Sequence, residues 1–118
     1  MIANGRGALQ EMRQARIIAR NLGIDVHAHE LRAVDEIAPM ISGWGEKMDG
    51  LYVCASPLLN THRESIASLA LKARLPTMFG ERENVEAGGL MSYGPRLTEL
   101  FRRAAHRTAC RARDPQRR

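Results

Sequence analysis

Polar side chains follow four apolar stretches of the sequence, at the point where each stretch ends. The four polar segments are residues 29–31, 56–58, 80–83 and 92–94. Together they supply hydroxyl groups, carboxylates, one guanidinium and one phenol. A few converging polar groups of this kind are typical of a site for a small polar or aromatic ligand.

The sequence lacks the motifs of the common catalytic classes. It contains no G-x-S-x-G nucleophile turn, no phosphate-binding G-x-x-x-x-G-K-[ST] loop and no complete G-x-G-x-x-G fingerprint. The segment "NGRGAL" holds only G-x-G, and we expect no strand before it, so we set it aside. The sequence therefore predicts a binding protein and not an enzyme.

Histidine and cysteine spacing predicts no metal site and no cofactor. His27 and His29 share one face of an expected strand, but no third ligand stands near them in the sequence. Cys54 and Cys110 form no metal or redox motif. Cys54 lies in an apolar run and is expected in the core, whereas Cys110 lies in an arginine-rich segment and is expected to be exposed.

The positive charge is concentrated at one end of the chain. The 118 residues suit one domain and carry a net charge of +5. Residues 106–118 hold five arginines and one acid, so they account for +4 of that charge. We expect residues 1–105 to form a single α/β lobe and residues 106–118 a basic disordered tail, with no specific nucleic-acid recognition.

Helical and strand patterns alternate along the lobe. Expected strands cover residues 24–31, 50–56, 75–79 and 89–93, and expected helices cover 9–22, 34–41, 61–73, 81–87 and 95–104. This order predicts a three-layer α-β-α lobe with a mainly parallel sheet of about four strands. Ligands bind beyond the carboxyl ends of such strands, so the four polar segments should open on one edge.

Several local signals support these elements. Gly23 is a natural stop for the first helix, Pro39 should leave the second one short or distorted, and Thr61 and Glu64 have the spacing of a capping box. The run 50–56 reads as a strand buried on both faces. We also expect buried side chains at Leu90 and Met91, and an inward face on the last helix at Leu97, Leu100, Phe101 and Ala104.

Two residues of the polar segments have two interpretations each. Arg82, between two glutamates, fits either a solvated helix start held by local ion pairs or a guanidinium that binds a ligand carboxylate. Tyr93 fits either a plain residue at a sheet end or a side chain of the cleft.

Three stretches carry a family resemblance. "LPTMFGERENVEAGGLMSYGPRLTELFRRAA", "DGLYVCASPLLNTHRESIASLALKARLP" and "ARIIARNLGIDVHAHELRAVDEI" resemble segments of ABC transporter substrate-binding proteins of the tryptophan and aromatic-ligand type. The similarity covers about residues 8–105 and is most specific in 75–105. It implies a type I periplasmic-binding-protein fold, in which two α/β lobes close on a small ligand and deliver it to a membrane permease.

The resemblance implies a truncated, single-lobe solute-binding component of an ABC importer. Its ligand would be aromatic or amino-acid-like, and its partner an ABC permease. Matching the family's motifs position by position assigns ligand contact to Ser56, Pro57, Leu58, Arg82, Glu83 and Tyr93.

The ends of the chain carry further expectations. The lobe's first strand and the second lobe are expected to be missing, and the exposed sheet edge would favour self-association. Family members are periplasmic, but residues 1–10 have no apolar signal region, which predicts a cytoplasmic fragment.

Two other function classes remain open at this stage. A small stand-alone α/β enzyme or signalling domain would place a phosphorylatable aspartate at a strand's carboxyl end, whereas Asp25 and Asp49 stand at strand starts. A nucleic-acid-binding protein would act through residues 106–118.

Overall fold

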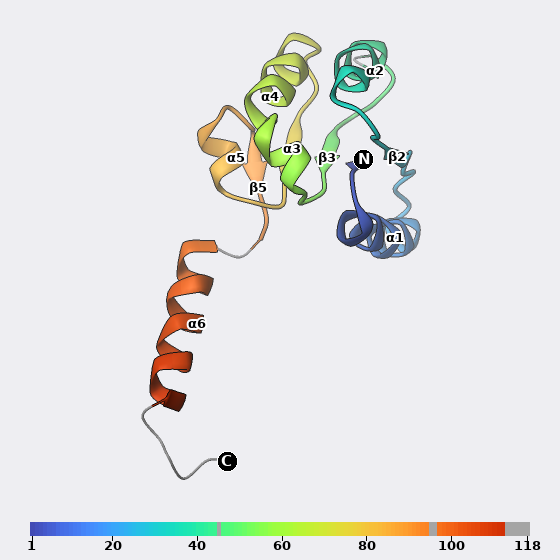
Figure 1. Ribbon diagram of the computed structural model, residues 1–118. Helices are drawn as coiled ribbons and strands as arrows, with labels where there is room; N and C mark the ends of the chain where they lie inside the picture. Colours follow the sequence, from blue (N-terminus) through green and yellow to red (C-terminus); the bar gives the residue numbers. More distant parts are fainter. Residues whose placement is uncertain (45, 95–96, 113–118) are drawn as a thin grey trace.

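The computed structural model describes residues 1–44, 46–94 and 97–112. Five short parallel strands form one sheet in the order β2-β1-β3-β4-β5 (Figure 1). The strands are β1 (Ile2–Ala3), β2 (His29–Glu30), β3 (Leu51–Val53), β4 (Thr77–Phe79) and β5 (Met91–Ser92). The predicted α/β class and parallel sheet are confirmed, with five strands where about four were expected.

The strand that sequence analysis expected to be missing is present as β1. Ile2 is paired with His29 on one side and with Val53 on the other, so β1 lies inside the sheet. Ile2 and Ala3 are almost fully buried. The argument that a lost central strand exposes a sheet edge was therefore wrong, because the edges are β2 and β5.

Helix α1 (Arg6–Asn21) covers one face of the sheet. Ala8 and Met12 pack there against Ala3 and Cys54, which is buried as predicted. The helix stops at Gly23, whose φ is +71°. The N–H groups of Gly23 and the next residue donate to the carbonyls of Arg20 and Ala19, so the predicted glycine stop is confirmed.

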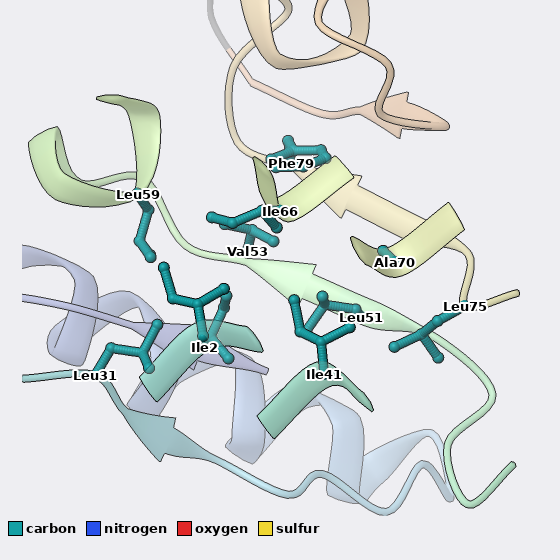
Figure 2. Close-up of a cluster of buried hydrophobic side chains, with 11 residues drawn as sticks. Ile2, Leu31, Ile41, Leu51, Val53, Leu59, Ile66, Ala70, Leu75 and Phe79 are labelled. Atoms are coloured by element: carbon teal, nitrogen blue, oxygen red, sulfur yellow. The ribbon is translucent and has the colours of Figure 1, made fainter. Parts of the chain in front are cut away.

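The opposite face holds the larger core. It is covered by η1 (Val34–Glu36), α2 (Ile37–Trp44), α3 (Pro57–Thr61), α4 (Arg63–Lys72) and α5 (Glu83–Glu86). Figure 2 shows Phe79 and Val53 from the sheet meeting Ile66 of α4. Pro39 is the third residue of α2, where an α-helix has no intrahelical acceptor for its N–H groups, so the expected short helix forms.

Two local predictions were wrong. The expected strand 24–31 is reduced to His29–Glu30, although the backbones of His27 and Leu31 also bond to Met1 and Ala3. The capping box does not form, since α3 and α4 meet at His62 and α4 has no side-chain cap. The Thr61 hydroxyl instead donates to the carbonyl of Pro57, at 2.9 Å.

Helix α6 (Leu97–Ala112) extends away from the sheet (Figure 1). Leu100 and Phe101 are 52% and 69% exposed, and Leu90 and Met91 are also exposed, so the predicted inward positions were wrong. The helix continues to Ala112, into the segment expected to be a tail. Pro95, residues 113–118 and the side chains of Leu97 and Cys110 lie outside the described part of the chain. Among the described residues, no helix is long and apolar enough to cross a membrane.

Candidate functional site

The parallel sheet brings all four predicted polar segments to one edge. The segments 56–58 and 80–83 follow β3 and β4, whereas 29–31 and 92–94 include the carboxyl ends of β2 and β5, and these strands run in the same direction. The last two segments are in direct contact, because a Cβ added at Gly94 would lie 1.9 Å from the carbonyl oxygen of Gly80. Only glycine fits at position 94, and it allows the chain after β5 to pass close to the loop after β4.

Ser56 has a structural partner at this edge. It is buried, and its Oγ accepts the N–H of Leu59 at 3.2 Å, which caps the first turn of α3. Pro57 occupies the first helical position and is exposed, whereas Leu58 is half-buried. The predicted Ser-Pro-Leu contact residues therefore set the start of a helix, and the α3–α4 junction follows directly.

Arg82 and Tyr93 point outward. The Nε of Arg82 lies 3.6 Å from Glu86 Oε1, and both side chains are more than half exposed. The structure therefore shows the local ion pair, which is the first of the two interpretations of Arg82. Tyr93 is 81% exposed at the end of β5, while its N–H donates to the carbonyl of Phe79. Neither side chain is buried together with the other predicted contact residues.

Buried polar atoms without a hydrogen-bond partner gather at the same edge. Five such side-chain atoms occur in the described residues, and all belong to two short segments. They are Asn60 Oδ1, Arg63 Nε, Glu81 Oε2, Glu83 Oε2 and Asn84 Oδ1. We call these five residues the edge cluster. Buried polar groups in folded proteins are almost always paired with protein atoms or ordered water, so these five atoms are positions where a water molecule or a ligand would bind.

The charges of the edge cluster influence one another. Burial raises the pKa of Glu81 first, the negative charge of Glu83 raises it further, and the Arg63 guanidinium opposes both effects. Within the first segment, Arg63 Nη1 donates to the Asn60 carbonyl at 2.9 Å. Four of the five unpaired atoms are acceptors, so the cluster favours a ligand that brings ammonium or hydroxyl donors.

Asn84 is the most deeply placed member of the cluster. It is 5% exposed, and its backbone carbonyl accepts the N–H of Gly89 at 3.0 Å. A Cβ added at Gly89 would meet the Phe79 ring at 2.5 Å, so this turn packs directly on the core. The core therefore fixes the position from which the Asn84 amide reaches the edge.

Sequence analysis found only part of this cluster. Glu83 was a predicted contact and Glu81 lay within a predicted segment, but Asn60, Arg63 and Asn84 were missed. Asn60 and Arg63 lie just beyond the Ser-Pro-Leu stretch, where "NTHR" is a run of polar residues at a helix start. That polar run was the available signal, but a sequence does not show which polar atoms stay unpaired.

The G-x-G segment that was set aside does follow a strand. Gly5 has φ +85° and connects β1 to α1, and no side chain caps that helix. Its free N–H groups therefore face the carboxyl edge near the β1–β3 boundary, where the strand order reverses. Asn4 of the same turn donates to the carbonyl of Leu31 at 2.7 Å. The remaining glycine of a dinucleotide fingerprint is absent, so this turn supports no dinucleotide site.

Cys54 and Tyr52 do not form a reactive centre. Burial raises the pKa of the Cys54 thiol to about 12, so the thiol stays protonated and is a poor nucleophile. Burial also raises the pKa of Tyr52, whose hydroxyl donates to Glu11. Glu11 accepts the Ala55 N–H as well, at 3.3 Å, which fastens α1 to the end of β3. These contacts have a structural role.

Two hollows lie away from the edge cluster. One, of about 810 Å³, lies toward the amino ends of the strands and includes Asp25 and Asp49 in its lining. The other, of about 520 Å³, lies between α2 and α4. We assign the site to the edge cluster, because neither hollow contains any of its buried unpaired atoms.

The raised pKa of Glu81 predicts a pH-dependent stability. Between the ordinary value of 4.5 and the raised one, the folded state binds more protons than the unfolded state, so the free energy of unfolding falls as pH rises. Glu81→Gln removes the carboxylate, so this loss of stability with rising pH should disappear. In urea unfolding at pH 4 and pH 7, the variant should gain stability over the natural protein only at pH 7.

The control is Glu86→Gln, which removes one carboxylate from an exposed position near the cluster. An equal advantage of Glu81→Gln at both pH values would show that burial of the Glu81 charge has no such cost.

Within the described residues, no group of three or more histidine, cysteine, aspartate or glutamate side chains could hold a metal ion. Comparisons of the chain with protein-family models, curated proteins and solved structures find no match.

Proposed function

We propose that the chain is the ligand-binding lobe of a solute-binding component of an ABC-type importer. The lobe would hold a small organic ligand at the carboxyl ends of its strands and carry out no reaction on it. The observation that carries this proposal is the edge cluster, because its buried acceptors lack partners within the described residues. The resemblance of residues 8–105 to ABC substrate-binding proteins supplies the transport role, the permease partner and the periplasmic location.

The ligand class follows from the chemistry of the cluster. Glu81 and Glu83 place two carboxylates beside two amide oxygens, so a cationic amine would gain charge-assisted hydrogen bonds there. Burial is the main cause of the raised pKa of Glu81, and an ammonium would offset the repulsion from Glu83 that adds to it. We therefore propose an amino-acid-like ligand whose ammonium group sits in the edge cluster. The aromatic side chain remains an implication of the family resemblance.

The outward-facing residues fit the same proposal. Exposed Arg82 lies between Glu81 and Glu83 of the cluster, and exposed Tyr93 follows β5 at the same edge of the sheet. In a two-lobed protein, residues at this rim would meet the ligand and the second lobe on closure. Arg82 would then exchange its weak, exposed contact with Glu86 for a ligand carboxylate.

A matched set of three ligands tests the proposal. L-Phenylalanine carries the ammonium, the carboxylate and the ring; phenethylamine lacks the carboxylate, and 3-phenylpropanoate lacks the ammonium. At about ten times its Kd, a bound ligand adds about 1.4 kcal/mol of stability. That should raise Tm by about 6 °C in a domain of this size. We expect the shift with L-phenylalanine, a smaller one with phenethylamine and none with 3-phenylpropanoate.

The three ligands share one aromatic ring, so nonspecific apolar binding would move Tm equally with all of them. A shift with 3-phenylpropanoate equal to that with L-phenylalanine would overturn the ammonium assignment. No shift with any amine or amino acid at millimolar concentration would count against the binding function.

A further inference from the structure

In the described part of the chain, no helix covers one sheet face at β4 and β5. Side chains alternate across a strand, and Leu51, Val53 and Phe79 point into the larger core. Tyr52 lies between Leu51 and Val53, and Met78 precedes Phe79, so both side chains point to the opposite face, on the α1 side. Met91 is in register beside Met78. Met91 is 51% exposed and the preceding Leu90 is 61% exposed. Tyr52 packs against α1. Met78, Leu90 and Met91 line one hollow, and we call these three residues the open face.

Helix α6 carries the apolar surface that such a face requires. Leu100 and Phe101 are exposed and lie next to each other on one side of the helix. Glu99 and Arg102 form an ion pair on a different side, at 2.8 Å. A helix with this pattern is normally buried along its apolar side, but here that side faces solvent.

The dimensions of the two surfaces match. Each strand occupies about 4.8 Å of the sheet, so the open face on β4 and β5 is about 10 Å wide. An α-helix with its side chains is about 10–12 Å in diameter. The 16 residues of α6 extend for about 24 Å, longer than these strands. One helix of this length covers the open face.

The charges of α6 and those beside the open face are complementary when the helix runs from the carboxyl edge to the amino edge of the sheet. A helix that follows β5 and returns over the sheet runs from the carboxyl edge to the amino edge. Asp25 and Asp49 line the hollow at that amino edge, next to the open face. The sequence places Arg107 and Arg111 in the last two turns of α6. A docked α6 would bring its basic end to these aspartates.

We propose that α6 of a second copy of this chain covers the open face, in a two-fold exchange that forms a dimer. The helix is directed away from its own sheet, and only four residues separate Ser92 from Leu97. Gly94, within this connection, is held against the carbonyl of Gly80. A short, constrained connection favours exchange of the terminal helix between copies.

The oligomeric state of variants tests the exchange. Leu100→Glu/Phe101→Glu places two negative charges in the apolar stripe, whereas Arg103→Glu changes the net charge by the same amount on the other side of α6. Light scattering after size exclusion at about 100 μM should give a dimer for the natural protein and for Arg103→Glu. The double variant should be a monomer. A monomeric natural protein, or a dimeric double variant, would overturn the proposal.

Disulfide trapping separates exchange from a helix that folds back on its own sheet. Met91→Cys and Phe101→Cys chains, each also carrying Cys110→Ser, are mixed and oxidised. We expect a covalent heterodimer, because a docked α6 brings position 101 of one copy to position 91 of the other. A single chain carrying both cysteines that closes its disulfide internally at high dilution and at 100 μM alike would contradict exchange.

Discussion

Replacing Phe79 with alanine should lower the free energy of unfolding by about 4 kcal/mol. Phe79 is fully buried at the end of β4 and is the largest side chain in the core. Its ring packs among residues from β3 and α4 (Figure 2). It also lies under Gly89, so the turn that carries Asn84 rests on it. Truncation would leave a cavity below the candidate site as well as in the core.

Urea unfolding followed by circular dichroism gives this loss directly. The control is Leu71→Ala, since Leu71 is 76% exposed on α4 and its truncation should change stability by less than about 0.5 kcal/mol. Equal effects of the two substitutions would show that the core is not centred on Phe79.

Long periodic patterns predicted the fold well. The first helix has apolar residues at spacings of three and four over more than three turns, and Gly23 ends it. The runs that contain Leu51 and Phe79 are apolar because these strands are covered by the larger core. Alternation of these helices and strands was enough to predict a parallel sheet.

Short elements and solvent-facing positions could not be predicted. β1 has two residues, too few to show an alternating pattern, and its identity comes from pairing with β2 and β3. The residues after Gly89 read as a buried strand, but burial of Met91 requires a helix on the open face. A sequence pattern shows that the stripe of α6 is apolar and cannot show what covers it.

The sequence predicted where the candidate site lies better than it predicted which residues form it. Parallel topology alone places the four polar segments at one edge. Within 80–83, however, adjacent residues of a helix start point in different directions. Glu81 and Glu83 therefore keep buried atoms, while Arg82 faces solvent. Asn60 and Arg63 enter the cluster because α3 and α4 meet at His62, a break that the capping pattern placed elsewhere.

Replacing both cluster carboxylates should weaken ligand binding by about 100-fold. Each of Glu81 and Glu83 would accept a charge-assisted hydrogen bond from an ammonium, and losing one such hydrogen bond costs about 1.5 kcal/mol or more. Two losses together are about 3 kcal/mol, which corresponds to about 100-fold in Kd. Glu81→Gln/Glu83→Gln keeps the size of both side chains and removes only their charge and acceptor strength.

The variant should remain folded, since neutralising Glu81 removes the cost of burying its charge near Glu83. The matched control is Glu46→Gln/Glu86→Gln, which removes two carboxylates from exposed positions. It should bind L-phenylalanine as the natural protein does, apart from the small effect of a changed net charge.

Calorimetric titration of L-phenylalanine into the natural protein and these two double variants tests the binding role of the edge cluster most directly. We predict measurable binding to the natural protein and to Glu46→Gln/Glu86→Gln, and an approximately 100-fold larger Kd for Glu81→Gln/Glu83→Gln. Equal Kd values for all three proteins would contradict the assignment of the ligand site to the edge cluster.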